Sequence, residues 1–220
     1  MQYAIRRMQV EDVPQANELD RECFPEWPPP SYKREILFSR LSHYLVAWEK
    51  KTDNPADHPV IEQRKSPQRS SRLGQFLERL RLLLKAEPDS PSTMNQRIVG
   101  LAGLWIMADE AHLITIGVRE AYRRQGIGEL LVIAALDLAL TLNAQVVTLE
   151  VRASNHTAQK LYAKYGFCNV GLRRGYYSDN REDAVVMSTD SLTSTPFQSH
   201  FQRLKQAHAQ RWGPTDCQIG

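Results

Sequence analysis

Cysteine is scarce in this sequence of 220 residues, and no apolar run reaches the length of a membrane-spanning helix. The three cysteines, Cys23, Cys168 and Cys217, are odd in number and far apart, which predicts neither a disulfide framework nor a paired-cysteine metal site. The N-terminal stretch MQYAIRRMQVEDVP lacks the apolar centre of a secretory signal peptide. We therefore expect a cytoplasmic protein whose cysteines are reduced and structural or incidental.

Metal-ligand spacing and internal repeats are also missing from the sequence. His112 and His156 have no ligand-like spacing to another histidine, cysteine or acidic residue, so we expect no metal site. The formal net charge of +3 is too small to require a polyanionic partner, and we expect no direct nucleic-acid binding. The sequence does have enough apolar residues, 42% of the total, to bury a core. It is therefore predicted to be globular.

Short strands and helices alternate wherever the chain shows hydrophobic periodicity. Apolar runs and alternation predict strands, and the three-four spacing of apolar residues predicts helices. The strands RIVGLAGLWIM and AHLITIGV are predicted to form a hairpin around residues 108–110. This order of elements predicts a single α/β domain. The predicted strands are 2–8, 43–48, 97–107, 111–118, 145–152, 167–173 and 183–189, and the predicted helices are 11–21, 31–40, 126–140 and 155–165.

The periodicity stops between residues 50 and 96, where Lys, Arg, Ser, Pro and Asp predominate. So long a stretch inside a compact domain predicts an insertion whose ends lie close together. We expect a domain over residues 1–190, a flexible insertion at 50–96 and a polar C-terminal tail at 191–220. Within the insertion, the spacing of apolar residues predicts a basic amphipathic helix over residues 73–85. Such a helix can contact a partner or a membrane surface, or it can cover its own domain.

Gly126 and Gly128 open a strongly apolar helix, although glycine is unfavourable in helices. At a strand-to-helix turn, free backbone N–H groups and glycines that permit close approach favour a phosphate group. Glu129 and Leu130 stand where a P-loop needs Lys and then Ser or Thr, and Leu131 stands where a dinucleotide fingerprint needs a small residue. Both of these motifs fail, which leaves another phosphate-binding turn or an ordinary glycine turn without a ligand.

Three motifs in order, RRQGIG, LEVRASN and RRGYYSDNREDAVVM, resemble those of the GNAT N-acetyltransferases. The turn fits the family pattern of Arg or Gln, two residues, Gly, one residue and then Gly or Ala. The later motifs, with LYAKYGF, are similar to the ribosomal-protein-alanine N-acetyltransferases of bacteria. The resemblance is loose over residues 1–48 and close over 97–190. It implies a GNAT domain, in which a mixed, mostly antiparallel sheet with a splayed strand pair is flanked by helices, and it implies acetyl-CoA as cosubstrate.

The resemblance also implies the residues that hold acetyl-CoA. The glycine turn would bind the pyrophosphate, and the end of the preceding strand would present backbone groups to the acetyl carbonyl and the pantetheine arm. Glu129 departs from the family pattern, in which this position is often basic. The implied cofactor-binding residues are Ile116, Gly117, Val118, Arg123, Arg124, Gln125, Gly126, Ile127, Gly128, Glu129 and Asn155.

Two residues carry the implied chemistry. Alternation along the strand 145–152 places Glu150 on the face opposite Val147, Leu149 and Val151. From the residues alone, Glu150 is a carboxylate paired with an arginine or a general base, and Tyr162 is a core residue or a catalyst. By resemblance, Glu150 is the general base for the acceptor amine and Tyr162 is the general acid for the departing coenzyme A thiolate.

The stretches FPEWPPP and RRGYYS correspond to loops that grip the start of a peptide in this family. Phe24, Tyr176 and Tyr177 are therefore the implied substrate-binding residues, with packing at the domain's edge as the alternative. The implied acceptor is the N-terminal α-amine of a protein, expected to be an alanine of a small-subunit ribosomal protein. Acetylation of a lysine or a small amine, and a non-catalytic acyl-CoA-binding or scaffold protein, are the other hypotheses.

Overall fold

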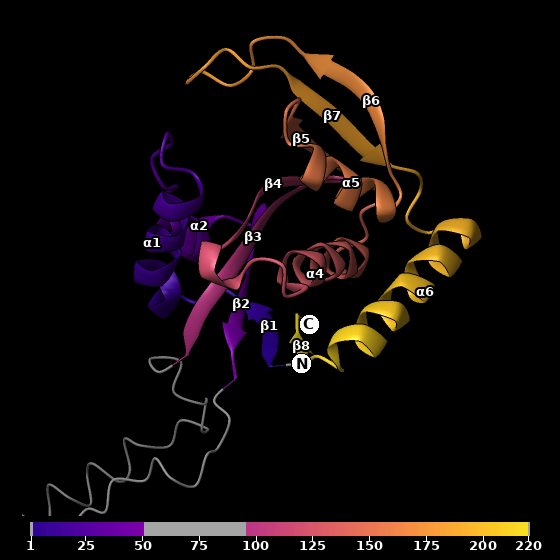
Figure 1. The fold of residues 1–220 in the computed structure, drawn as a ribbon, viewed down its shortest axis with the longest axis horizontal. Helices are drawn as coiled ribbons and strands as arrows, with labels where there is room; N and C mark the ends of the chain where they lie inside the picture. Colours follow the sequence, from indigo (N-terminus) through magenta and orange to yellow (C-terminus); the bar gives the residue numbers. More distant parts are fainter. Residues whose placement is uncertain (1, 51–95, 220) are drawn as a thin grey trace, which may run out of the picture. The chain divides into compact units, whose positions relative to one another are not determined.

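The computed structural model describes residues 2–50 and 96–219, which belong to one compact unit (Figure 1). The predicted insertion, with its basic helix at 73–85, lies outside the described residues apart from its two ends. Within the described ranges, no helix is long and apolar enough to cross a membrane.

An eight-stranded mixed sheet forms the centre of this unit, in the order β6-β7-β5-β4-β3-β2-β1-β8. Neighbouring strands are antiparallel except for β4 with β5 and β1 with β8. The mostly antiparallel sheet and the β3-β4 hairpin confirm the predicted fold class. The strands are β1 (Tyr3–Arg7), β2 (Ser42–Glu49), β3 (Arg97–Met107), β4 (Glu110–Val118), β5 (Val146–Arg152), β6 (Phe167–Arg173), β7 (Ala184–Thr189) and β8 (Cys217–Gln218).

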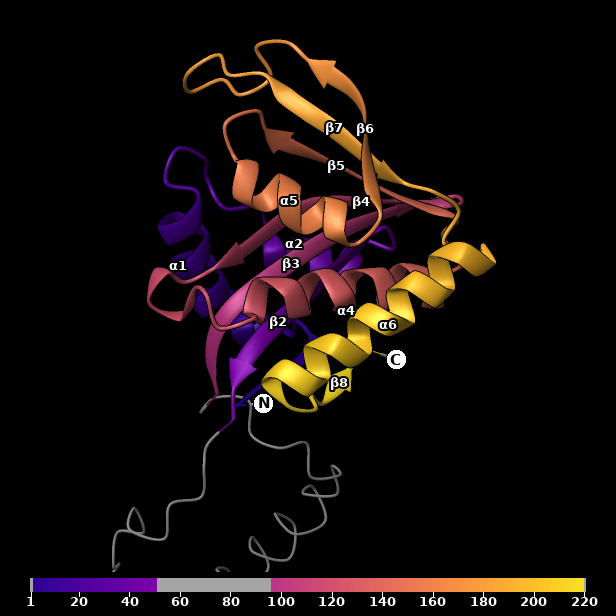
Figure 2. The ribbon, with the colours of Figure 1, turned by 45° about the vertical axis from the view of Figure 1, so that its right-hand side comes forward.

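Helices lie on both faces of the sheet (Figure 2). In both ribbon views α1 and α2 lie on one side of the sheet and α4 on the other, and α6 contacts α4. The α-helices are α1 (Val13–Cys23), α2 (Tyr32–Phe38), α4 (Ile127–Thr141), α5 (His156–Lys164) and α6 (Thr195–Trp212), and the short 3-10 turns are η1 (Val10–Asp12) and η4 (Glu120–Tyr122).

Strand alternation sorts the side chains into two apolar cores, one on each face of the sheet. In β2, Leu45 and Ala47 belong to the larger core with α4, whereas Tyr44 and Val46 belong to the smaller core with α1 and α2. Ten residues of α4 are buried, because the sheet covers one side of this helix and α6 contacts it as well. The glycine turn that leads into α4 is therefore attached to the best-buried helix of the unit.

The parallel pair β4 and β5 separates part way along its length. Pairing runs from Glu110 opposite Val146 to Leu113 opposite Leu149 and then ends. At the same level the register between β3 and β4 shifts, so that Ile114 has no partner on β3. A bulge of this kind bends a strand and increases its twist. The end of β4 therefore diverges from β5, which confirms the splayed strand pair implied by the resemblance.

The segment after residue 190 differs from the polar tail expected from the sequence. Ser194 caps α6 by accepting a hydrogen bond from the Phe197 backbone, and Phe197 and Phe201 are buried in the larger core. Beyond α6, β8 pairs with β1. Polar residues separate the two phenylalanines, so the helical spacing of apolar residues is weak in the sequence. Ser194 followed by Pro196 is nevertheless a recognisable signal for the start of a helix.

Candidate active site

A stripe of polar side chains crosses β4 and β5 where the two strands begin to separate. Glu110 and His112 come from β4, and Thr148 and Glu150 come from β5, with His112 directly opposite Thr148. Alternate residues of a strand share a face, and the intervening residues of β5 are buried in the larger core. The predicted alternation along β5 is confirmed, and Glu150 is the first residue of β5 beyond the last pair with β4.

The side chain of Glu150 in this stripe is only 6% exposed. Its Oε2 lies 2.8 Å from His112 Nε2, and its Oε1 lies 3.0 Å from Arg173 Nη2 on β6. The Arg173 contact is an ion pair without hydrogen-bond geometry, so Oε1 is buried with no hydrogen-bond partner among the described residues. Pairing with an arginine, one of the two roles that the sequence allows for Glu150, is therefore present. Because Oε1 accepts no hydrogen bond from the described residues, it can accept a proton.

A hydrogen-bonded chain continues from His112 away from Glu150. Thr148 Oγ1 donates to Glu110 Oε1 at 2.6 Å and lies 3.0 Å from His112 Nδ1. This network escaped the sequence-based prediction, in which His112 was considered only as a metal ligand. Its partners depend on the pairing of strands 36 residues apart, which no local pattern encodes. In the described ranges, no group of three or more His, Cys, Asp and Glu side chains could hold a metal ion.

Tyr162 lies on α5 with its side chain buried against Phe167, at 5.8 Å between ring centroids. Burial raises the pKa of the Tyr162 phenol well above its ordinary value of 10, and the nearby phenol of Tyr177 adds to this shift. The hydroxyl of Tyr162 therefore stays protonated throughout the neutral range and has a proton to donate.

The glycine turn has the backbone conformation that requires glycine at Gly126, whose φ is +79°. Gly126 is the N-cap of α4 and provides no side-chain cap, so the backbone N–H groups of the first turn lack a capping side chain. A Cβ added to Gly128 would meet only Val118 Cγ2, at 3.8 Å, which leaves space beside the backbone. Uncapped N–H groups next to open space suit a phosphate group.

The end of β4 faces the gap between the splayed strands. Ile116, Gly117 and Val118 all lie beyond the last pair with β5, so this edge of β4 has no partner from β5. A Cβ on Gly117 would come within 3.1 Å of Cys23 Sγ, which explains why a small residue is needed where α1 packs. Cys23 is half-buried, and all three cysteines are unpaired.

The charged and polar side chains of the turn are only partly available to a ligand. Gln125 Oε1 accepts from the hydroxyl of Tyr3 at 2.5 Å, and Arg123 Nε donates to the carbonyl oxygen of Val118 at 3.2 Å. Arg124 is exposed and pairs with no carboxylate in the part of the chain that the structure describes. Arg124 is therefore the side chain of the turn best placed to approach an anion.

Glu129 and Asn155 are both engaged by α5. Glu129 Oε1 accepts from Lys164 Nζ and, at 2.7 Å, from the hydroxyl of Tyr165. Burial alone would raise the pKa of Glu129, but the hydrogen bonds from these two residues outweigh it and lower the pKa. The acidic departure from the family pattern is thus neutralised by Lys164 instead of facing a phosphate. Asn155 Oδ1 caps α5 by accepting from the Ala158 backbone at 3.1 Å.

The C-terminal helix α6 packs against the glycine turn. His208 Nε2 lies 3.1 Å from the carbonyl oxygen of Gly126. A Cβ on Gly126 would lie only 2.6 Å from Trp212 Nε1, an indole nitrogen that is buried without a hydrogen-bond partner among the described residues. These two contacts were missed because the segment was expected to be a tail.

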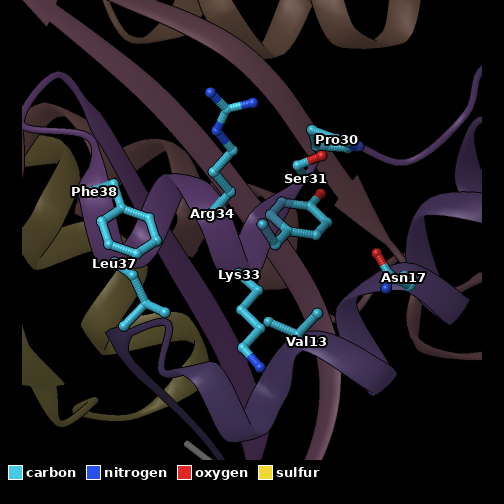
Figure 3. Close-up of a pocket in the computed structure, with 9 residues that line it drawn as sticks. Val13, Asn17, Pro30, Ser31, Lys33, Arg34, Leu37 and Phe38 are labelled. Atoms are coloured by element: carbon cyan, nitrogen blue, oxygen red, sulfur yellow. The ribbon is translucent and has the colours of Figure 1, made fainter.

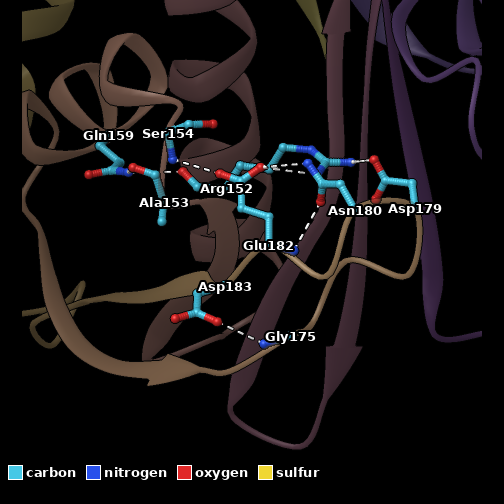
Figure 4. A network of polar contacts seen from close by, with 9 residues as sticks. All are labelled: Arg152, Ala153, Ser154, Gln159, Gly175, Asp179, Asn180, Glu182 and Asp183. Atoms are coloured by element: carbon cyan, nitrogen blue, oxygen red, sulfur yellow. Dashed lines mark hydrogen bonds and ion pairs between the residues drawn. The ribbon is translucent and has the colours of Figure 1, made fainter.

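Ion pairs hold the loop between β6 and β7 against the end of β5 (Figure 4). Arg152 Nη2 lies 2.9 Å from Asp179 Oδ2, and Arg152 Nη1 lies 3.2 Å from Glu182 Oε2. Hydrogen bonds from Ser154, with those from Asn180 and Arg152, lower the pKa of Glu182 from 4.5 to about 2. The loop that carries the predicted substrate-binding tyrosines is therefore anchored to β5.

Three aromatic rings meet beside this network. Arg152 Cζ stacks 3.9 Å from the ring centroid of Tyr177, whose ring centroid lies 6.1 Å from that of Trp27 and 5.2 Å from that of Tyr176. Burial raises the pKa of Tyr177 to about 12. The structure thus brings Trp27, instead of the expected Phe24, into ring contact with the tyrosine pair. Phe24 is half-buried nearby in sequence, and its role in substrate binding stays a prediction.

A surface pocket of about 440 Å³ lies between α1 and α2 (Figure 3). Its lining includes Val13 and Asn17 from α1 and Lys33, Leu37 and Phe38 from α2. No residue of β4, β5 or the glycine turn lines this pocket. The candidate site is therefore the splayed strand pair with its polar stripe, and not this pocket.

Known proteins are similar to this chain in sequence and in fold. The model of the acetyltransferase (GNAT) family matches residues 60–167. A Bacillus subtilis protein assigned as a ribosomal protein bS18-alanine N-acetyltransferase is 30% identical over 185 residues, covering 84% of this chain and 93% of that protein. The ribosomal protein bS18-alanine N-acetyltransferase of Escherichia coli K12 is 39% identical over 98 residues, covering 44% of this chain and 66% of that protein.

The fold of this chain is also similar to that of a solved structure. The crystal structure of the ribosomal-protein-S18-alanine N-acetyltransferase from Escherichia coli superposes with a TM-score of 0.58 and 21% identity, covering 88% of this chain and 97% of that chain.

Proposed function

Because the chain belongs to the GNAT family of acetyltransferases, we propose that it acetylates the N-terminal α-amine of a protein, with an alanine of a small-subunit ribosomal protein as the expected acceptor. The observation that carries the proposal is the position of Glu150, whose side chain is buried where β4 and β5 separate. Its Oε1 is ion-paired with Arg173 but accepts no hydrogen bond from the described residues. The similarity to the Bacillus subtilis protein supports the choice of acceptor, since it extends over 93% of that protein.

Acetyltransferases of this family use acetyl-CoA. The glycine turn has features that suit the pyrophosphate group of acetyl-CoA. The uncapped N–H groups of α4, the open space beside Gly128 and the exposed Arg124 fit an anionic group. In the proposal, backbone N–H groups from Gly126 to Glu129 bind the pyrophosphate, and the unpaired edge of Ile116–Val118 aligns the pantetheine arm. Bound acetyl-CoA supplies an acetyl group activated as a thioester.

Two side chains of this chain then move protons. Glu150 removes a proton from the acceptor ammonium, directly or through water, so that the nitrogen lone pair can attack the acetyl carbonyl carbon. Tyr162, which its raised pKa keeps protonated before the reaction, donates its phenolic proton to the sulfur as the carbon–sulfur bond breaks. The phenolate then takes up the second proton that the attacking nitrogen loses when the amide forms. The products are an amide and a thiol, and no covalent enzyme intermediate is required.

An α-amine suits this arrangement better than a lysine side chain does. The α-amine ordinarily loses its proton near pH 8, whereas a lysine side chain requires about pH 10.4, and only the first is within easy reach of a carboxylate base. The aromatic cluster of Trp27, Tyr176 and Tyr177 can pack against the first residues of an extended peptide. In the proposal, this aromatic cluster favours a peptide terminus over a compact free amine.

The first test is an acetylation assay with matched acceptors. The protein and acetyl-CoA are incubated with short peptides that differ only in their first residue, beginning with alanine. There are two controls. One is the same peptide with a blocked α-amine and one internal lysine, and the other is free spermidine. We expect thiol release and a mass gain only with a free α-amine, and most with alanine. Acetylation of spermidine or of the blocked peptide, with none at an α-amine, would contradict the proposal.

The role of Tyr162 is tested by Tyr162→Phe, which removes the acid and leaves the ring. We expect acetyl-CoA binding to be retained and turnover to fall by about 10²-fold or more, because general acid catalysis ordinarily contributes that much. Tyr44→Phe is the matched control, since the Tyr44 hydroxyl bonds to Glu35 on α2, away from the splayed strands. Unchanged turnover in Tyr162→Phe would remove Tyr162 from the mechanism.

A further inference from the structure

We propose that the C-terminal helix α6 positions the glycine turn for acetyl-CoA, with His208 and Trp212 as the positioning residues. Both side chains contact Gly126 from the side of α6, one at its carbonyl oxygen and the other over its α-carbon. The proposal rests on the proposed binding of acetyl-CoA at this turn. It gives a role in the reaction to a segment that lies outside the three family motifs.

The carbonyl oxygen of Gly126 accepts two hydrogen bonds. One comes from the backbone N–H of Leu130, at 2.9 Å, and closes the first turn of α4. The other comes from His208 Nε2, at 3.1 Å, on a side chain that is buried. A carbonyl oxygen can only accept, so Nε2 must carry a hydrogen, as it does in one neutral tautomer and in the charged ring. The contact therefore does not require a charged imidazole.

Fixing this carbonyl also fixes the direction of an N–H group. The peptide unit that joins Gly126 to Ile127 is planar and trans, so its C=O and its N–H point in opposite directions. The C=O points toward Leu130 and His208, and the N–H of Ile127 consequently points away from α6. Together with the next two N–H groups of the first turn, it has no partner within the helix. These are the groups that the proposed function assigns to the pyrophosphate.

Trp212 packs on the same residue of the turn. A Cβ on Gly126 would lie 2.6 Å from Nε1 and 2.7 Å from Cε2 of the indole, so the five-membered ring lies directly over the α-carbon. Glycine is conformationally permissive, and the ring limits how far this residue can move. The indole Nε1 is buried with no hydrogen-bond partner among the described residues. An unpartnered buried donor costs stability, so stability alone does not explain an indole at this position.

The end of α6 is attached on two sides, which allows it to support the turn. Lys205 Nζ lies 2.8 Å and 2.7 Å from the two carboxylate oxygens of Asp137 on α4. Figure 2 shows α6 running beside α4. Beyond the helix, the backbone N–H of Ile5 on β1 donates to the carbonyl oxygen of Asp216 at 3.0 Å. The part of α6 that contacts the turn is therefore attached to α4 directly and to the sheet through the residues that follow.

The binding test measures the Kd of CoA by calorimetry in the wild type and in variants of α6. His208→Leu removes the donor, Trp212→Ala removes the ring, and His208→Gln keeps a donor of similar reach. The matched control is Phe197→Leu, which loosens the opposite end of α6, where Phe197 packs against Gly166.

We expect the Kd to rise about 3–10-fold in His208→Leu and in Trp212→Ala, as for the loss of one hydrogen bond or contact. His208→Gln and Phe197→Leu should stay within about twofold of the wild type, since each leaves the support of the turn in place. A lower Tm in His208→Leu and Trp212→Ala with an unchanged Kd would show that α6 only stabilises the fold, and would overturn the proposal.

A second readout uses the wild type alone. Coupling between two sites is reciprocal, so if α6 favours the conformation that binds CoA, CoA must stabilise α6 on the turn. Helix ends open locally, and amide hydrogen exchange measures this opening. We expect saturating CoA to slow exchange in residues 204–212 by a similar factor, about 3–10, and to leave residues 195–201 unchanged. Unchanged exchange in residues 204–212 would overturn the proposal.

The two proposals can fail separately in these experiments. CoA binding with the expected effects in α6, but without acetylation of any peptide, would refute only the proposed function. Acetylation of peptides with a Kd that is indifferent to His208→Leu and Trp212→Ala would refute only the role of α6. A wild type that does not bind CoA would overturn both.

Discussion

Replacing Gly126 by alanine tests whether the glycine turn is a fixed structure that the C-terminal helix holds in place. Gly126 has a φ of +79°, which side chains with a Cβ rarely adopt. The added methyl carbon would lie 2.6 Å from Nε1 and 2.7 Å from Cε2 of Trp212, well inside van der Waals contact. Backbone strain and displacement of the indole therefore act in the same direction.

The magnitude can be assembled from these two effects. A left-handed conformation costs an L-residue about 1–2 kcal/mol. Inserting a methyl group into a filled site costs about 1–3 kcal/mol. Trp212 is near the end of α6 and only partly buried, so its ring can give way to some extent. We therefore expect Gly126→Ala to lower the free energy of unfolding by about 3 kcal/mol, near the middle of the two ranges added together. In a chain of this size, a loss of about 3 kcal/mol lowers Tm by roughly 6–12 °C.

The assay is thermal and urea unfolding of wild type, Gly126→Ala and Gly128→Ala without acetyl-CoA. Gly128→Ala is the matched control, because its Cβ would make only an ordinary contact with Val118 and alanine favours a helix by about 0.5–1 kcal/mol. A Tm of Gly126→Ala within about 2 °C of the wild type would refute the strain argument. In a Trp212→Ala background, Gly126→Ala should cost less by about 0.5 kcal/mol or more, and equal costs would refute the indole contact.

Three further changes test an ion pair, a core residue and an exposed carboxylate of the described unit. Asp12→Ala leaves the buried guanidinium of Arg6 uncompensated and should cost about 3–5 kcal/mol in urea unfolding, with the exposed Glu11→Ala as a near-neutral control. Phe201→Ala should cost about 3–5 kcal/mol if α6 is part of the core, and a Tm equal to the wild type would show that it is not. Glu182 has a lowered pKa, so its stabilisation is complete above pH 4.5 and disappears as pH falls toward 2; the Tm gap between wild type and Glu182→Gln should close over that range, and a constant gap would contradict it.

Local patterns in the sequence predict most of the described elements. Alternation and apolar runs place the strands within a few residues of their observed bounds, and the Gly126 turn is predicted at the start of α4. The helix α6 was missed because its buried side chains are separated by polar residues, which weakens the periodic signal. Its packing on the turn depends on the distant residues His208 and Trp212, which no short window contains together with Gly126.

The sequence by itself determined the order of strands and helices, the glycine turn and the candidate pair Glu150 and Tyr162, because these follow from local periodicity and from motifs. Only the tertiary structure decided what surrounds them. The His112 contact and the Arg173 ion pair require particular strand registers, and the ring contact between Trp27 and Tyr177 requires two loops to meet. Periodicity fixes which face a side chain occupies, whereas its partner across the sheet is set by how distant strands align.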